Sequence, residues 1–398
     1  MLSEESLELI VHDHLAELEW QAGHGPDFAP GSGERDAWND IVLRGRLRNA
    51  VRNLNPDVPE EYLDQAIGEV ITPKSQSAIA ENRRIHQILV EGYRGIEYID
   101  HEGNIQNPTI YFLSSQPHKN DYLSLNQVTI ANLDGERRFD VVCYVNGMPL
   151  AFIELKKTGA NTSVEGAYNQ LQTYVKEFGM AFRFANIVIP SDDLSAKYGT
   201  PFTPWNHFAP WNVDEDGSPV DPNNMVVAGE PVTQLDLLLD GLFNVERFGQ
   251  LYSDFTAFDD TAEGLVMRIA KPHQYFAVTK AVGSTITAAR GDKRAGVIWH
   301  TTGAGKSMEM ELYTAKIMRR PEMLSPTVIV LNDRTELDEQ LFETFNRSTI
   351  LPETPRNIES RAELRELLSQ KTSGGIYFST LQKFGLNGKG ELREKEHP

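Results

Sequence analysis

The sequence has a single cysteine, Cys143, which excludes an intrachain disulfide framework and is typical of a protein from a reducing compartment. It has no apolar run long enough to span a bilayer. Its acidic, amphipathic beginning lacks the basic and apolar regions of a signal peptide. Internal repeats and low-complexity tracts are absent as well. These absences predict a soluble cytoplasmic protein with no membrane partner.

Basic residues are scarce relative to acidic ones, since 38 Lys and Arg against 57 Asp and Glu give a net charge of −19. A general nucleic-acid coat needs local positive charge to bind phosphates, so the charge argues against that class. It does not exclude a DNA enzyme that lines one channel with Arg and Lys. A chain of 398 residues with 40% hydrophobic and 24% charged residues has room for two or three globular domains.

Hydrophobic periodicity and turn residues predict an α/β protein in two parts. The elements expected in the first part are helices over 3–20, 37–54, 59–70, 76–90 and 163–178, a loop over 23–34, and strands over 95–99, 109–113, 126–133, 138–145, 149–157 and 184–190. Residues 200–224 are too rich in Pro, Asn and Asp for regular structure. We expect domains at 1–235 and 258–398, joined by a helical linker over 236–257.

The stretch "FDVVCYVNGMPLAFIELKK" (139–157) places charges within apolar strands. Glu154 and Lys156 face the same side of their strand, and Asp140 begins the preceding one. Two converging carboxylates can hold Mg²⁺, to which the carbonyl of Leu155 could add an oxygen. A lysine there can orient or deprotonate the attacking water, or offset phosphate charge. The pattern predicts metal-assisted phosphodiester hydrolysis; the alternative is a half-buried hairpin with a solvated charged face.

The turn at Asn146 and Gly147 sets a condition on this site. With a two-residue loop and regular pairing, Asp140 would oppose Ile153 and lie on the opposite face of the sheet from Glu154. A shared metal site therefore requires an odd-length loop or a β-bulge, with Gly147 in the left-handed conformation.

The helix that follows carries Gln170 and Tyr174 at positions i and i+4, hence on one face. As functional residues they would contact DNA or steady the nuclease site. The alternative is an ordinary polar helix edge.

The segment "AGVIWHTTGAGKSMEMELYTAKIMRR" (295–320) has the pattern of a strand, a glycine-containing loop and a helix. Such a loop and the helix N-terminus form a cradle for phosphates. Lys306 would reach the β- and γ-phosphates, and the hydroxyl of Ser307 would bind Mg²⁺. His300 occupies the first glycine position of the usual G-x-x-x-x-G-K-S pattern. The remaining loop residues of the predicted cradle are Thr302, Gly303, Ala304 and Gly305.

Other residues of this second part are candidates for nucleotide and DNA contacts. Gln274, within "KPHQYFAV", could make a two-point contact with adenine. Open α/β sheets bind ligands at the carboxyl ends of their strands. Two segments with such ends would contribute Asp333, Arg334, Thr380 and Gln382 to a nucleic-acid track; taken singly, each of them is better explained as a strand cap or loop residue.

Taken together, these motifs resemble the restriction (R, HsdR) subunit of type I restriction-modification enzymes over essentially the whole chain. The family's PD-(D/E)xK and Q-x-x-x-Y motifs match Asp140, Glu154, Lys156, Gln170 and Tyr174. "PHQYFAV" and "WHTTGAGKS" resemble its adenine motif and Walker A loop, and "NDRTELDEQ" and "STLQKF" resemble its motifs Ia and Ib. The resemblance implies a PD-(D/E)xK endonuclease domain followed by an incomplete first RecA-like (superfamily 2 helicase) domain.

The same resemblance implies Mg²⁺ and ATP as cofactors. The implied partners are double-stranded DNA and the methyltransferase (M) and specificity (S) subunits, in a complex that translocates DNA with ATP and cuts it. The family's Walker B box, second RecA-like domain and helical tail do not follow in these 398 residues, so we expect this chain by itself to lack ATPase and translocase activity. The alternatives are a stand-alone repair helicase-nuclease, another restriction class, or a non-catalytic ATP-responsive DNA-binding module.

Overall fold

The computed structural model describes residues 4–133, 135–157, 163–192, 194–227, 230–332, 335–370 and 372–380. The chain divides into two compact units. The first comprises Met1–Thr256 and Leu265–Ile269, and the second comprises Ala257–Gly264 and Ala270–Pro398. Both units mix helices and strands, which agrees with the expected α/β class. The residues expected to form a linker belong to the first unit, apart from Ala257. No helix within the described ranges is long and apolar enough to cross a membrane.

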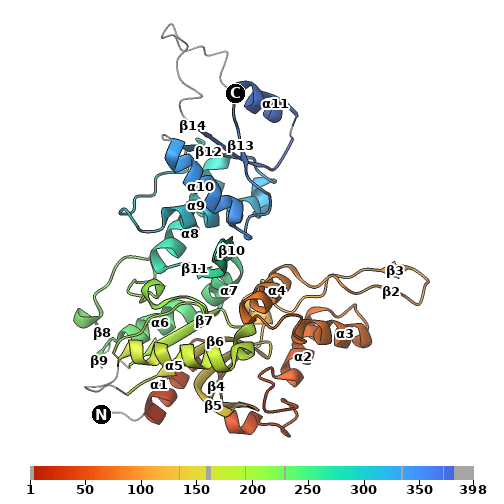
Figure 1. The fold of residues 1–398 in the computed structure, drawn as a ribbon, viewed down its shortest axis with the longest axis vertical. Helices are drawn as coiled ribbons and strands as arrows, with labels where there is room; N and C mark the ends of the chain where they lie inside the picture. Colours follow the sequence, from red (N-terminus) through yellow and green to blue (C-terminus); the bar gives the residue numbers. More distant parts are fainter. Residues whose placement is uncertain are drawn as a thin grey trace. The chain divides into compact units, whose positions relative to one another are not determined.

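A five-stranded mixed sheet organises the first unit, in the order β1-β4-β5-β6-β7 (Figure 1). The central strands β4, β5 and β6 are antiparallel, whereas β1 runs parallel to β4 and β7 runs parallel to β6. The strands are β1 (Gln21–His24), β4 (Tyr122–Asn132), β5 (Gly135–Val145), β6 (Met148–Leu155) and β7 (Ile187–Ser191). Strand β1 overlaps the predicted loop over 23–34 at residues 23 and 24 only, where pairing with the distant β4, rather than a local pattern, makes a strand; residues 25–34 have no strand and a single 3₁₀ turn, as predicted.

Helices contact the sheet at two places: α1 (Glu4–Glu17) contacts β1, β4 and β6, and α5 (Val164–Glu177) contacts β6 and β7. The other helices of this unit are α2 (Arg44–Leu54), α3 (Glu60–Ile71), α4 (Ala78–Glu91), α6 (Gln234–Phe243) and α7 (Val245–Asp254). Helix α2 begins later than predicted. The guanidinium of Arg35 donates to the carbonyls of Trp38 and Asp40, which holds the preceding segment as a loop.

Short strands complete the first unit: β2 (Tyr98–Ile99) pairs with β3 (Ile105–Gln106), and β8 (Val226–Val227) pairs with β9 (Glu230–Pro231). The strand predicted over 109–113 is wrong, because this segment contributes only an isolated bridge between Tyr93 and Ile110. Most of the segment predicted to be irregular, 200–224, lacks helix and strand, apart from two 3₁₀ turns.

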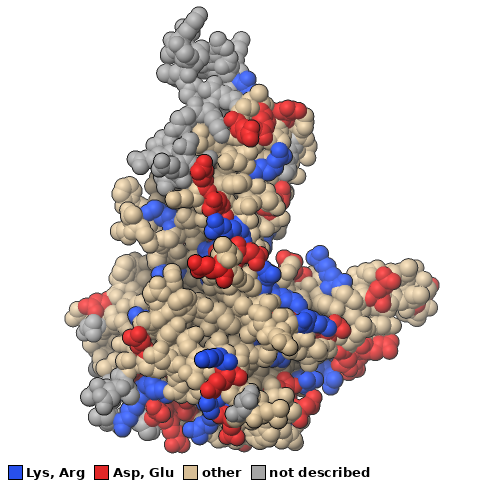
Figure 2. Space-filling model, in the orientation of Figure 1, with Lys and Arg blue, Asp and Glu red and all other residues tan. Residues whose placement is uncertain are grey.

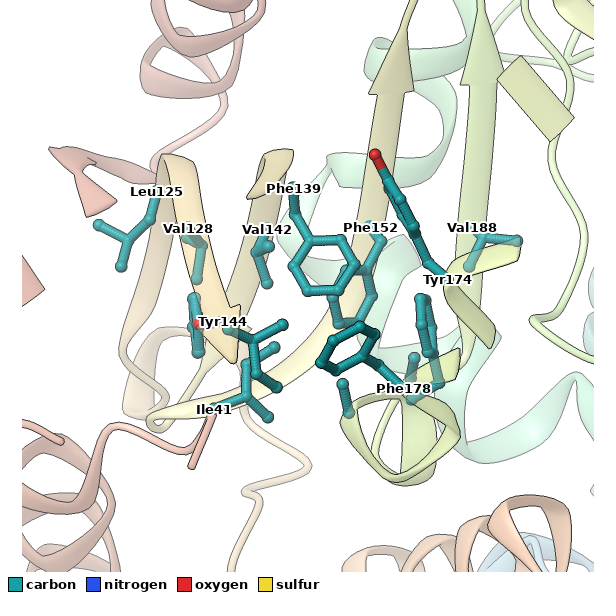
Figure 3. Close-up of a cluster of buried hydrophobic side chains, with 14 of the residues drawn as sticks. Ile41, Leu125, Val128, Phe139, Val142, Tyr144, Phe152, Tyr174, Phe178 and Val188 are labelled. Carbon is teal, nitrogen blue, oxygen red and sulfur yellow. The ribbon is translucent and has the colours of Figure 1, made fainter. Parts of the chain in front are cut away.

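An aromatic cluster joins β5, β6 and α5 (Figure 3). The ring of Phe139 packs edge-to-face against Phe152, Tyr174 and Phe182, with centroid distances of 5.0, 5.4 and 5.7 Å respectively. Burying a side chain of this kind stabilises a fold by about 1.5–3 kcal/mol relative to leaving it exposed. The cluster therefore fixes α5 against the two strands that carry the candidate nuclease residues.

Trp20 brings α6 and α7 into the core of the same unit. Its Nε1 donates to the carbonyl of Phe243 over 2.8 Å. Its ring packs edge-on against Tyr122, Phe243 and Phe248, and the side chain is only 2% exposed. The two helices thus share the hydrophobic core of the sheet and are not separate from it.

An ion pair adds to the attachment of α1 to α6. His14 Nε2 lies 2.7 Å from an oxygen of Asp240, and His14 Nδ1 lies 3.7 Å from an oxygen of Asp236. Burial lowers the pKa of His14, but the hydrogen bonds to the two aspartates outweigh it and raise that pKa to about 9. The imidazole is therefore charged at neutral pH.

The second unit contains a parallel three-stranded sheet of order β12-β14-β13. Its elements are α8 (Pro272–Arg290), α9 (Lys306–Met318), β12 (Val328–Asn332), α10 (Thr335–Arg347), β13 (Arg356–Asn357), α11 (Arg361–Gln370) and β14 (Ile376–Thr380). Strands β10 (Thr256–Thr261) and β11 (Gly264–Ile269) carry residues of both units.

The strand predicted before the glycine loop, over 295–299, is wrong for this structure. These residues are irregular, and the side chains of Val297 and Trp299 are each 90% exposed. Within the described part of the chain, no strand pairs with this segment to satisfy its backbone groups. An apolar run that finds no partner strand does not form a strand of its own.

The hairpin of β5 and β6 contains both a tight turn and a bulge. Asn146 and Gly147 form the two-residue turn, with left-handed φ angles of 51° and 77°. The strand register shifts just before the turn, because Cys143 pairs with Ala151 and leaves Leu150 as an extra residue in β6. The predicted β-bulge and the left-handed glycine are both confirmed; a longer loop is not needed.

Gly147→Ala is expected to destabilise the first unit more than Gly103→Ala. Both glycines are left-handed, with φ of 77° and 87°. A Cβ at position 147 would lie 2.4 Å from the carbonyl oxygen of Leu43 and 2.7 Å from the nitrogen of Leu47, whereas nothing lies within 4 Å of a Cβ at position 103. Gly103→Ala should therefore cost only the left-handed strain, about 1–2 kcal/mol. Urea unfolding measures both losses, and equal values would contradict this account.

Candidate nuclease centre and phosphate loop

The three predicted nuclease residues lie together where β5 and β6 separate. The bulge at Leu150 brings Asp140 opposite Glu154, one step beyond the last regular pair of the two strands. Asp140 Oδ2 accepts a hydrogen bond from the backbone N–H of Leu155 over 2.7 Å. Glu154 Oε1 accepts one from Lys156 Nζ over 3.1 Å. Two carboxylates and an ammonium therefore converge at the end of one hairpin.

Glu154 is the most deeply buried of the three. Its side chain is 1% exposed, and Oε2 is buried without a hydrogen-bond partner among the described residues. Burial, and then the neighbouring charge of Asp140, raises the pKa of Glu154 to about 8. An unsatisfied buried carboxylate oxygen is costly. A bound cation would remove that cost, so the donor set fits a hard divalent metal.

The electrostatic surroundings favour an ammonium at Lys156. Burial lowers the pKa of Lys156, but the charges of Glu154 and Asp140 outweigh burial and raise it. Burial also raises the pKa of Asp140, against the opposing effects of the Leu155 N–H and the Lys156 charge. Burial thus makes both carboxylates harder to ionise, and at Glu154 the charge of Asp140 adds to this effect, while the two carboxylates make the lysine harder to deprotonate.

Gln170 and Tyr174 lie beside the carboxylates on α5. The helix begins after Ser163, whose Oγ accepts a hydrogen bond from the N–H of Gly166. Gln170 Nε2 donates to the hydroxyl oxygen of Tyr174, and burial followed by the charge of Glu154 raises the pKa of that hydroxyl. The Tyr174 side chain lies along the aromatic cluster in Figure 3 and is 7% exposed.

Two acidic residues of α1, which the sequence analysis did not single out, also belong to these surroundings. Glu8 is 3% exposed, and its Oε2 accepts a hydrogen bond from Asn126 Nδ2 over 3.2 Å. Burial and then the charge of Asp140 raise the pKa of Glu8. Glu4, one turn earlier, contributes to the raised pKa values of Asp140 and Glu154.

A signal for Glu8 is present in the sequence. Leu7, Val11 and Leu15 form the apolar stripe of α1, and Glu8 lies beside them on the buried side of the helix. A charged residue inside such a stripe is seldom buried without a purpose. Opposite Asp140, the pairing of β4 with β5 is interrupted at Gln127, whose φ of 52° is left-handed. The strand geometry is therefore irregular on both sides of Asp140.

The glycine loop of the second unit has the exposed surface that a phosphate cradle needs. Gly303 and Gly305 adopt left-handed φ angles of 84° and 83°, and α9 begins after Gly305 without a side-chain cap. Thr302 and Ser307 are exposed. Lys306 Nζ donates to the carbonyls of two residues of the preceding segment, at 3.1 Å and 2.9 Å.

Gln274 is buried, with 3% exposure, and its amide contacts the protein at both ends. Its Oε1 accepts from the N–H of Lys271 over 2.8 Å. Its Nε2 donates to the carbonyls of Ala304 and Gly305, each over 3.3 Å. In this structure the amide supports the glycine loop, and the adenine contact stays a prediction.

The predicted DNA track is only partly described. Thr380 is the last residue of β14 and is 4% exposed. Asp333, Arg334 and Gln382 lie outside the described residues. On the face shown in Figure 2, Lys and Arg are interspersed with Asp and Glu, and the described residues of that face form no continuous basic surface.

Comparisons with known proteins give the family. Residues 1–207, more than half of the chain, match the family described as the type I restriction enzyme R protein N terminus. The chain belongs to this family. Residues 273–397 match the SWI2/SNF2 ATPase family, so an SNF2-like ATPase region follows the amino-terminal part.

Similar proteins are named as endonuclease subunits of type I restriction enzymes. The HindI endonuclease subunit of a type I restriction enzyme from Haemophilus influenzae is 34% identical over 97% of this chain. The putative MjaIXP endonuclease subunit from Methanocaldococcus jannaschii is 32% identical over 95% of it. A Staphylococcus aureus type I subunit, SauCOLORF180P, is 25% identical over 58% of it. The matched part is 37% of each of the first two relatives and 22% of the third.

Glu154→Gln is expected to stabilise the protein increasingly as the pH rises. The folded-state pKa of Glu154 is about 8, against an ordinary value of 4.5. Between these values the unfolded chain binds fewer protons than the folded one, so wild-type stability is lost as pH rises. Glutamine cannot ionise and avoids this loss. Each pKa unit corresponds to about 1.36 kcal/mol, so the gain near pH 8 should reach a few kcal/mol.

Thermal melts at several pH values, recorded without divalent cations, measure the gain. Glu17→Gln is the matched control, because Glu17 is exposed. A Glu154→Gln effect that is the same at every pH would contradict the burial of this carboxylate.

Proposed function

We propose that the first unit is a PD-(D/E)xK-type nuclease that hydrolyses phosphodiester bonds of DNA with Mg²⁺. The observation that carries the proposal is the unsatisfied, fully buried Oε2 of Glu154, opposite Asp140 and beside Lys156. Asp140, Glu154 and the carbonyl of Leu155 are hard oxygen donors of the kind that Mg²⁺ prefers. When bound, Mg²⁺ would supply Lewis-acid polarisation of the phosphate and a more acidic water.

The side chains of the site would orient the reacting groups and offset negative charge at the phosphate. The raised pKa of Lys156 keeps it an ammonium. In this state it offsets negative charge at the phosphate and orients water, and does not accept a proton. The backbone N–H of Leu155 orients Asp140, and Tyr174 packs beside Glu154 with Gln170 on its hydroxyl. Because Tyr174 is buried, it would support the site from the protein interior and would not contact DNA.

The second unit would bind ATP. Thr302 to Ser307 would hold the phosphates, with Lys306 on the β- and γ-phosphates and Ser307 on Mg²⁺. Gln274 would read adenine once its present contacts with the loop carbonyls are exchanged. Asp333, Arg334, Thr380 and Gln382 would follow one DNA strand.

The whole enzyme would then be the ATP-dependent DNA endonuclease and translocase of a type I restriction system. The names of the similar endonuclease subunits support this reading. Its partners would be double-stranded DNA and the M and S subunits. Co-purification with M and S subunits distinguishes this function from that of a stand-alone repair helicase-nuclease.

In a complex assembled with a full-length subunit, the two activities should separate. Alanine at Asp140, Glu154 or Lys156 should abolish DNA cleavage and leave ATP hydrolysis and translocation largely intact. Lys306→Ala should abolish ATP hydrolysis, and with it the cleavage that depends on translocation. Plasmid cleavage and phosphate release, measured on the same preparations, test both parts. A Glu154 variant that cuts at the normal rate would refute the nuclease assignment.

Glu8→Gln is expected to weaken the Mg²⁺ dependence of cleavage in the same complex. The charge of Asp140 opposes the ionisation of Glu8, which indicates that a cation near Asp140 would also experience the charge of Glu8. Removing this charge should raise the Mg²⁺ concentration needed for half-maximal cleavage several-fold, and excess Mg²⁺ should restore the rate. Glu5→Gln, on the exposed side of the same turn, is the control. Identical Mg²⁺ titrations of the two variants would exclude a role for Glu8.

A further inference from the structure

His300, which replaces the first glycine of the usual phosphate-loop pattern, lies in a cluster that the proposed ATP site does not use. Its Nδ1 is 2.6 Å from Oε1 of Glu309, on the second turn of α9. His273, in the first turn of α8, places Nε2 at 4.0 Å from the same oxygen. One ligand atom from each of the three residues lies within 4.8 Å of the other two.

The three side chains of this cluster are buried or partly buried, and they come from separate segments of the chain. Glu309 is 3% exposed, and the side chains of His273 and His300 are 37% and 24% exposed. The three residues come from two helices and the segment before the glycine loop. The two imidazoles meet edge-to-face, with ring centroids 5.2 Å apart. A deeply buried carboxylate therefore lies at the base of a partly open pair of histidines.

We propose that His273, His300 and Glu309 bind a zinc ion that joins the start of α8 to the phosphate loop. Two imidazole nitrogens and one carboxylate oxygen form a donor set suited to zinc, whereas Mg²⁺ prefers oxygen ligands alone. In a tetrahedral site with bonds of about 2.0–2.1 Å, neighbouring ligand atoms lie roughly 3.3 Å apart. The separations of 2.6 Å and 4.0 Å bracket this value, so small side-chain rotations would complete the geometry.

The ion would take the place of hydrogen bonds that the cluster makes now. His273 Nε2 lies 2.9 Å from the carbonyl of Ala304, and His300 Nδ1 contacts the carboxylate of Glu309. Zinc would bind the lone pairs of His273 Nε2 and His300 Nδ1. Each neutral ring would therefore carry its proton on its other nitrogen. Three protein ligands leave a fourth position for water. None of the three ligands belongs to residues 302–307, so the zinc site adjoins the proposed phosphate cradle, through Ala304, without sharing a ligand with it.

Zinc binding to the purified chain tests the proposal. Equilibrium dialysis against zinc in excess Mg²⁺, followed by elemental analysis, should show one zinc retained per chain, since Mg²⁺ would occupy the oxygen-only nuclease centre. Co²⁺ in place of zinc should give the intense visible absorption of a four-coordinate ion. Because even indirect partners of a metal change its affinity by roughly 10–100-fold, Glu309→Gln should weaken zinc binding at least tenfold.

Three further variants keep the test decisive. His273→Gln changes a partly exposed side chain and should also lose the zinc and the visible absorption, even if Glu309→Gln fails to fold. His101→Gln, at a site where the side chain is 92% exposed, and Asp140→Asn, in the nuclease centre, should retain both. A wild-type chain that keeps no zinc would overturn the proposal. Equal retention by His273→Gln and His101→Gln would overturn it as well.

Discussion

The first unit is built around the cost of keeping the Glu154 carboxylate away from water. A charge with no exposed surface is tolerated only when neighbouring groups or a cation compensate it. Lys156 compensates one oxygen, and the other has no hydrogen-bond partner among the described residues. The Phe139 cluster excludes water from one side, and the bulge at Leu150 sets Asp140 on the opposing strand. The packing of the aromatic cluster, the strand register set by the bulge and the charge of Lys156 therefore all act on the carboxyl group of Glu154.

Local signals in the sequence were sufficient for much of this arrangement. Helices α1, α3, α4 and α5 follow their apolar periodicity closely, because each has one buried face. The alternation of faces along a strand showed that Asp140 and Glu154 could meet only through an irregular hairpin. The bulge is therefore a consequence of chemistry and strand geometry together. The position of the extra residue, Leu150, could not be read from an apolar run in which every side chain is buried.

Features that depend on distant partners were not predictable in this way. Strand β1 exists through its pairing with β4, and Trp20 gains its significance from Phe243. The apolar segment over 295–299 has the composition of a strand, yet it forms none in the described structure. Glu8 has a local signal, as a charge beside the apolar stripe of α1, but its proximity to Asp140 follows only from the tertiary placement of α1. In each case the local pattern is weak or ambiguous, and the tertiary contact decides.

The attachment of α1 to α6 has a mechanical consequence. Trp20, which follows α1, donates a hydrogen bond to the carbonyl of Phe243, and His14 of α1 pairs with Asp240, so the carboxyl-terminal end of α1 is fixed to α6. The same helix carries Glu4, whose charge raises the pKa values of Asp140 and Glu154, and Glu8, whose own pKa is raised by the charge of Asp140. The helix that brings acidic groups close to Glu154 is therefore held in its place by α6.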